Sequence, residues 1–259
     1  MNGEPEIHEF RPGLVSGNGS VDSGPIFAAV YGTLTGGSAL SDPDPYALFR
    51  DRSEAMGWLT EERDGGLWGM NDAGRGETGS GMAAWFQVGV DGSNVERTSV
   101  PIEPLLACAA DVVSWMGDLD LDAVQVLVPT GLANGKVLAS RRTPFAFDEI
   151  DVVDRDRMRA TVDGGQAVDL SERGEAIADR LSDQNVFTAI ATGAEASSRA
   201  RTLPFDDSFW VGPPHRPAVL DGTLPEWSLA IVGWLAAIIT DSVADCGVNT
   251  PIVVTVERR

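Results

Sequence analysis

The same order of strands and helices recurs in the two halves of the chain, and this recurrence limits the folds it can adopt. Alternating apolar residues predict strands, and apolar residues three or four positions apart predict helices. In the N-terminal half we expect strands at 26–31, 82–90, 95–100 and 123–128, and helices over 48–59 and 104–116. In the C-terminal half we expect strands at 158–162, 186–191, 198–203 and 252–256, and helices over 170–181 and 226–243. Each half therefore predicts the order β-α-β-β-α-β.

This order is typical of a ferredoxin-like unit, in which two helices cover one face of an antiparallel sheet. The predicted strands carry apolar residues on both faces, among them Val88, Val90, Ile190 and Val253. A sheet with two apolar faces has to bury both of them. We therefore expect an α+β fold with two tandem ferredoxin-like (βαββαβ) halves, packed sheet to sheet as a pseudo-twofold α/β barrel or sandwich.

The composition along the chain predicts four segments. They are an irregular N-terminal arm at 1–24, a first ferredoxin-like half at 25–130, a linker that could form a hairpin at 131–156, and a second ferredoxin-like half at 157–259. The predicted helix over 226–239 is apolar on nearly all sides. A helix of this kind has to be covered on more than one side. We expect its cover to come from the other half, the arm or a second subunit, so a homo-oligomer is one of the alternatives.

The charge of the chain excludes some partners. Asp and Glu number 39 against 19 Lys and Arg, and the formal net charge is −20. Nucleic-acid binding needs a positive face, so we expect no nucleic-acid partner. An anionic membrane surface would repel such a chain, and the longest apolar run, at 229–239, is too short to span a bilayer. The acidity instead favours a basic protein as a partner, because opposite charges accelerate association.

The start of the chain and its cysteines bear on location. No basic and apolar leader is visible in the first residues, so we expect a cytoplasmic protein. The chain has two cysteines, Cys108 and Cys246, which we expect to be reduced thiols in the core.

Catalytic and metal-binding motifs are scarce. The chain has two histidines, His8 and His215, and no spacing of Cys and His that would bind zinc. The Asp-rich run at 118–122 departs from a calcium loop, because the position that requires glycine is Ala123. We therefore expect no metal and no cofactor. If the protein is an enzyme, His215 and Asp207 are the candidate catalytic residues, since imidazole and carboxylate groups can exchange protons near neutral pH.

Two long segments that we expect to be loops carry tryptophan. They span 64–81 and 205–222, and both could cover one opening of the predicted barrel. The candidate ligand-binding residues are Trp68, Asn71, Asp72, Arg75, Trp210 and Arg216. The other tryptophans in predicted elements, Trp85, Trp115, Trp227 and Trp234, are expected in the core.

These loops predict a small-molecule enzyme or binding protein for a hydrophobic or aromatic organic ligand, without an obvious cofactor. The alternative is a non-catalytic acidic interaction protein, such as a scaffold, regulatory subunit or immunity-type binder, with a basic protein partner.

Overall fold

The computed structural model describes residues 23–36, 44–61, 65–91, 100–132, 155–166, 168–182, 188–192 and 216–259. Its strands are β1 (Ser23–Thr35), β2 (Gly69–Arg75), β3 (Met82–Asp91), β4 (Asp118–Val128), β5 (Asp156–Asp163), β6 (Thr188–Thr192), β7 (Ala218–Leu224) and β8 (Ile252–Arg258). Its α-helices are α1 (Pro45–Ala55), α3 (Ile102–Met116), α4 (Gly174–Ser182) and α5 (Leu229–Asp245), and two 3-10 turns are η1 (Thr130–Leu132) and η4 (Ser171–Arg173).

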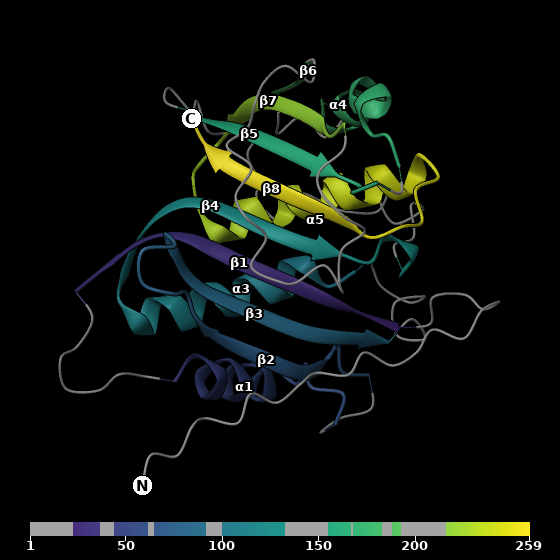
Figure 1. Cartoon of the computed structure of the whole chain (residues 1–259). Coiled ribbons are helices and arrows are strands. Elements are labelled where there is room, and N and C mark those ends of the chain that lie inside the picture. The colour runs from purple at the N-terminus through teal and green to yellow at the C-terminus, as the bar shows by residue number, and fades with distance from the viewer. Residues whose placement is uncertain are drawn as a thin grey trace, which may run out of the picture.

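The strands form one antiparallel sheet in the order β2-β3-β1-β4-β8-β5-β7-β6 (Figure 1). The pair β4–β8 joins the two halves of the chain, with Val126 opposite Val254. Outward from this pair, the N-terminal half contributes β4, β1, β3 and β2, and the C-terminal half contributes β8, β5, β7 and β6. The protein is therefore a mixed α+β fold.

The expectation that two sheets pack face to face is wrong. β4 and β8 would each be an edge strand if its half stood alone, with a row of unpaired backbone N–H and C=O groups. Pairing the two edges satisfies these groups and merges both halves into one sheet.

The helices pack against one face of this sheet and form the main core. α3 contacts α5, while α1 packs on α3 and α4 on α5. Figure 1 shows α3 and α5 behind the sheet. Alternate strand residues, such as Val30, Val124, Val162 and Val254, point into this core and are buried. The residues between them face the other side, which we call the open face because the described helices do not cover it.

Helix α5 lies at the centre of this layer. It begins where the Ser228 side chain accepts a hydrogen bond from the Ile231 backbone N–H at 3.4 Å, which satisfies a free donor of the first turn. Every residue from Ile231 to Val243 is buried. Helix α3, which covers one side of α5, belongs to the N-terminal half. The apolar surface of α5 is therefore buried within one chain.

Two strands lie where the sequence predicts loops. β2 occupies part of the expected loop at 64–81, and β7 occupies the end of the expected loop at 205–222. β3 confirms the expected strand at 82–90, but it is the third strand of the N-terminal half, because β2 precedes it in the expected loop and pairs with it. The expected strand at 198–203 and almost all of that at 95–100 lie outside the described residues, as do most of the arm and the linker.

The Asp-rich run at the start of β4 contains a bulge. The register of β1 and β4 shifts between Tyr31 and Gly32, which leaves Asp122 without a direct partner. Leu121 turns to the helical core, whereas Ala123 faces the open side. Within the described residues, no group of acidic, histidine or cysteine side chains is arranged to hold a metal ion.

The remaining sequence expectations concern cysteine chemistry and membranes. Cys108 and Cys246 are both free. Burial raises the pKa of the Cys108 thiol to about 11, so this thiol is protonated at neutral pH. None of the helices in the described ranges is long and apolar enough to cross a bilayer.

Candidate functional site

The open face changes character from one half of the sheet to the other. In the N-terminal half, most of its buried residues are apolar, such as Phe27, Ala29 and Leu127, with Gln125 as a buried polar residue. In the C-terminal half, the open-face positions of β5, β7 and β8 include charged residues, together with threonines and the buried Val219 and Val253. The charged residues are Arg157, Arg159, Asp163, Asp221 and Glu257, with Arg259 directly after β8. The second half of the sheet therefore presents a charged surface on a chain whose net charge is −20.

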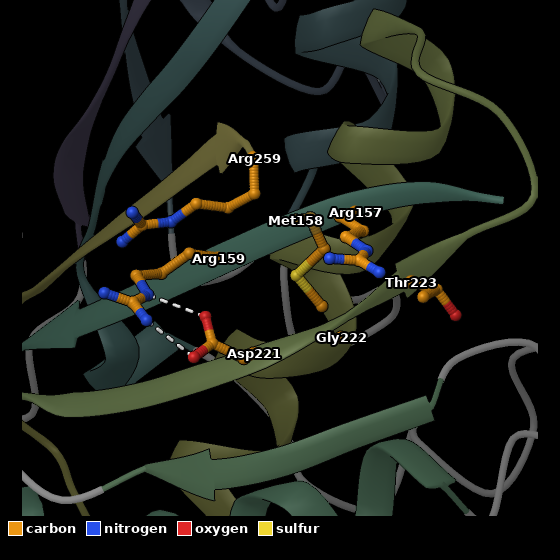
Figure 2. A pocket seen from close by; sticks show the side chains of 7 residues that line it. All are labelled: Arg157, Met158, Arg159, Asp221, Gly222, Thr223 and Arg259. Atoms are coloured by element: carbon orange, nitrogen blue, oxygen red, sulfur yellow. Dashed lines mark hydrogen bonds and ion pairs between the residues drawn. The ribbon is translucent and has the colours of Figure 1, made fainter. Parts of the chain in front are cut away.

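A pocket of about 440 Å³ lies within this charged surface (Figure 2). It is lined by Arg157, Met158, Arg159, Asp221, Gly222, Thr223 and Arg259. Met158 and Gly222 are opposite each other across β5 and β7. Since side chains alternate along a strand, the Met158 side chain turns into the core, where it is buried. The backbone of this pair therefore forms the floor, and the charged side chains form the walls.

Arg159 and Asp221 form the wall at one end. They are direct cross-strand neighbours, and the Arg159 Nε and Nη2 atoms each donate a hydrogen bond of 2.6 Å to the Asp221 carboxylate. These hydrogen bonds hold the pKa of the Asp221 carboxyl below its usual range and raise the pKa of the Arg159 guanidinium. Asp221 is the one acidic residue among the described residues of the lining, and its charge is neutralised by this pair.

Arg259 lies toward the same end of the pocket as Arg159 (Figure 2). The Arg259 backbone N–H donates to the Arg157 carbonyl at 2.9 Å, which fixes the chain beside β5. The Arg259 guanidinium forms an ion pair with the Glu257 carboxylate at 3.3 Å. The charges of Arg259 and Glu257 therefore balance.

Arg157 and Thr223 lie toward the other end of the pocket (Figure 2). They are opposite each other across β5 and β7. The Arg157 side chain is exposed, and it forms no ion pair with any residue in the described part of the chain. The nearest acid along the strand, Asp156, instead accepts a hydrogen bond from Arg258 at 2.7 Å. Among the described residues, Arg157 is therefore a positive charge of this pocket without an acidic partner.

Among the ligand-binding residues expected from the sequence, Trp68 is a core residue. It is 0% exposed, and its ring packs against those of Phe49 and Trp58, with centroids 6.3 and 5.2 Å away. Leu59 pairs with Trp68 in an isolated bridge beside β2, which holds the indole under the helices. Trp68 lies just before β2, outside the named strands, and its side chain is buried in the core rather than exposed at an opening.

The other expected residues are spread over the sheet. Asn71, Asp72 and Arg75 are exposed on the edge strand β2, and Asn71 occupies a bulge opposite β3. Arg216 precedes β7, where its guanidinium pairs with Asp169 at 3.0 Å. Strands are about 4.8 Å apart, and five strands separate β2 from β7. The structure therefore does not bring Arg216 together with the β2 residues at one opening. Asp207, Trp210 and His215 lie outside the described residues.

Two further tryptophans were expected in the core, and the structure confirms this for one of them. Trp234 is buried in α5, as expected. Trp115 is expected in the core but is 76% exposed near the end of α3. It lies off the face of α3 that Val112, Val113 and Met116 bury.

The sequence contains a signal for the pocket, which is the alternation of charged and apolar residues in two strands. Arg157 and Arg159 alternate with Met158 and Ala160, and Asp221 alternates with Leu220. Charged residues at every second position of a strand indicate a face that is not packed against apolar residues. Strand β7 falls in an expected loop, so its charges had no predicted partner.

No family model, curated protein or solved structure matches this chain.

Proposed function

We propose that this protein binds or transforms a small organic molecule in the pocket formed by β5, β7 and β8. The observation that supports the proposal is the pocket itself. Its volume of about 440 Å³ lies within the range of ligand sites, roughly 300–1,000 Å³. A backbone floor with a few charged groups at its ends is suited to a ligand that has a hydrophobic or aromatic body. If the ligand is transformed, His215 and Asp207 are the proposed acid–base residues.

The test is to fill the pocket. Thr223 is a half-buried residue of the pocket lining in the C-terminal half. Thr33 is an exposed threonine on the open face of β1, in the N-terminal half. Thr223→Phe is expected to displace any ligand that co-purifies with the protein, whereas Thr33→Phe is expected to retain it. Native mass spectrometry of the wild type and both variants measures the retained ligand. Equal retention by the two variants would place the ligand elsewhere.

We also propose that the fold arose as two tandem ferredoxin-like units. Two observations support this: each half has the element order β-α-β-β-α-β, and each half arranges its strands in equivalent order outward from the β4–β8 pair. A solved structure in which the two halves superpose would test it.

The second candidate function is a non-catalytic interaction protein with a basic protein partner. The exposed Trp115 supports it, because tryptophan is enriched in the centres of protein interfaces and its ring attracts cations. Asp118 follows soon after Trp115, and the last turn of α3 has no basic residue. Trp115→Ala is expected to weaken binding of a poly-lysine peptide at low salt. Met56→Ala, which removes the other large apolar side chain that is exposed among the described residues, is expected to leave binding unchanged.

We propose a cytoplasmic location, and a homo-oligomer remains a proposal as well. Because a single chain already buries α5, this helix no longer requires a second subunit. The same native mass spectra report the number of chains.

A further inference from the structure

We infer that the ligand of this pocket is an organic acid with a single carboxylate, which Arg157 and Thr223 bind at one end while the rest of the molecule lies along the Met158–Gly222 floor. The inference rests on the proposed small-molecule function of the same pocket, and it specifies the chemical class of the ligand.

The first argument is the charge balance of the pocket. Asp221 neutralises Arg159 through two hydrogen bonds, and Glu257 pairs with Arg259. Within the described ranges of the chain, one lining guanidinium, that of Arg157, is left without an acidic partner. A ligand with one negative charge would complete this balance. A neutral ligand would leave the exposed Arg157 guanidinium compensated by solvent alone.

The second argument is the geometry of the donors. A guanidinium is a planar fork of N–H donors that matches the two oxygens of a carboxylate. The Thr223 hydroxyl, on the strand opposite Arg157, can donate a further hydrogen bond. These groups meet the needs of one carboxylate at this end of the pocket.

The third argument concerns the rest of the ligand. Between the two ends, Met158 and Gly222 lie opposite each other on the paired strands β5 and β7. A flat apolar body fits over such a floor. The far end meets the Arg159–Asp221 pair, whose remaining N–H groups and carboxylate lone pairs can bind a polar substituent without a net charge.

A phosphate monoester is the main alternative anion, and the observations favour it less. It carries a charge near −2 at neutral pH and is best held by two convergent cations. Arg259, the second cation, points toward the end of the pocket opposite Arg157 and is paired with Glu257 (Figure 2).

The experiment compares acids with their uncharged amides. The probes are benzoate, phenylacetate and hexanoate, each with its primary amide, and phenyl phosphate. Each is titrated by calorimetry into the wild type, Arg157→Gln and the control Arg50→Gln. Arg50 is an exposed arginine on α1, so both variants remove the same charge, but only one alters the pocket. Thermal unfolding of both variants establishes that they fold.

The wild type is expected to bind at least one acid about tenfold more tightly than its amide, a preference of about 1.4 kcal/mol. Arg157→Gln is expected to lose this preference, and Arg50→Gln to keep it. Equal binding of acid and amide by the wild type would overturn the inference and leave the proposed pocket standing. Binding of phenyl phosphate that exceeds that of every acid and strengthens above the second phosphate pKa of about 6 would also overturn it. An acid that binds Thr223→Phe as tightly as the wild type would refute both the inference and the proposed site.

Discussion

Arg159 on β5 holds the carboxylate of Asp221 on β7 with two hydrogen bonds, from Nε and Nη2, each 2.6 Å long. The pair is a direct neighbour contact across two antiparallel strands, so the sheet register sets its geometry. The Arg159 side chain is only 14% exposed, whereas that of Asp221 is 36% exposed. The pair therefore joins two strands and also neutralises the acid that lines the pocket.

Asp221→Asn is expected to destabilise the protein by about 1 kcal/mol at neutral pH, because it replaces a charge-assisted pair with a neutral one in a partly solvated position. The pKa of Asp221 is lowered in the folded state, chiefly by the hydrogen bonds from Arg159. This stabilisation is therefore fully present above the unfolded pKa of about 3.9 and is lost as the pH falls through the lower folded value. Urea unfolding of both proteins between about pH 7 and pH 2 measures the difference.

The control for this prediction is Asp179→Asn, which alters an exposed carboxylate on α4. Its effect should remain small across the same pH range. A stability difference between wild type and Asp221→Asn that stays constant down to acidic pH would contradict the role of the ion pair.

Trp68→Ala is expected to cost roughly 3–5 kcal/mol of unfolding free energy, because a fully buried indole is removed from its contacts with Phe49 and Trp58. Trp115→Ala is the matched control. Its side chain is largely exposed, so the change should stay within about 0.5 kcal/mol. Chemical denaturation of the two variants decides whether Trp68 is a core residue. Similar stabilities would show that the core assignment is wrong.

Gly32→Ala is expected to destabilise the protein by about 3 kcal/mol. A Cβ atom at Gly32 would lie 2.2 Å from the Asp120 backbone oxygen, at the bulge between β1 and β4, so the strands would have to separate. Gly79→Ala provides the comparison, because Gly79 has φ +87 but no atom within 4 Å of an added Cβ. It should cost only about 1 kcal/mol, from backbone conformation alone. Thermal unfolding measures both. Equal costs would mean that the bulge tolerates a side chain.

Gln125 and Thr255 hydrogen-bond across the pair β4–β8 that joins the halves, with Nε2 donating to Oγ1 at 3.1 Å. Gln125 also accepts a hydrogen bond from the Tyr31 hydroxyl at 3.3 Å. Gln125→Ala and Thr255→Val should each cost about 1–3 kcal/mol, because each leaves a polar partner unsatisfied. The double variant should cost less than the sum of the two, which a double-mutant cycle in urea measures. Strict additivity would show that the two side chains do not interact.

The sequence supported the prediction of elements with strong internal periodicity. The helices at α3 and α5 and the strands β1, β4, β5 and β8 have apolar residues that face the core at regular intervals, and a single stretch of chain is enough to show them. β2 was missed because it is an edge strand. It has few apolar residues, contains two glycines and is interrupted by the bulge at Asn71.

The candidate site depended on residues that are distant in the sequence. Arg159 and Asp221 are 62 positions apart, and each has the appearance of an ordinary surface charge until β5 and β7 are placed side by side. Trp68 shows the reverse case, because it was expected at an open ligand site and lies in the core. A tryptophan among glycines suggested a loop, but the bridge to Leu59 and the ring of Phe49 bury it.

The order of strands and helices in each half follows from local periodicity, because each element needs only its own alternation of apolar and polar residues. The tertiary structure alone decided that the halves share one sheet, because backbone hydrogen bonds between β4 and β8 do not depend on any local pattern. It also decided that Arg157 has no acidic partner in the part of the chain that the structure describes, because a charge balance is a property of three neighbouring strands and not of one.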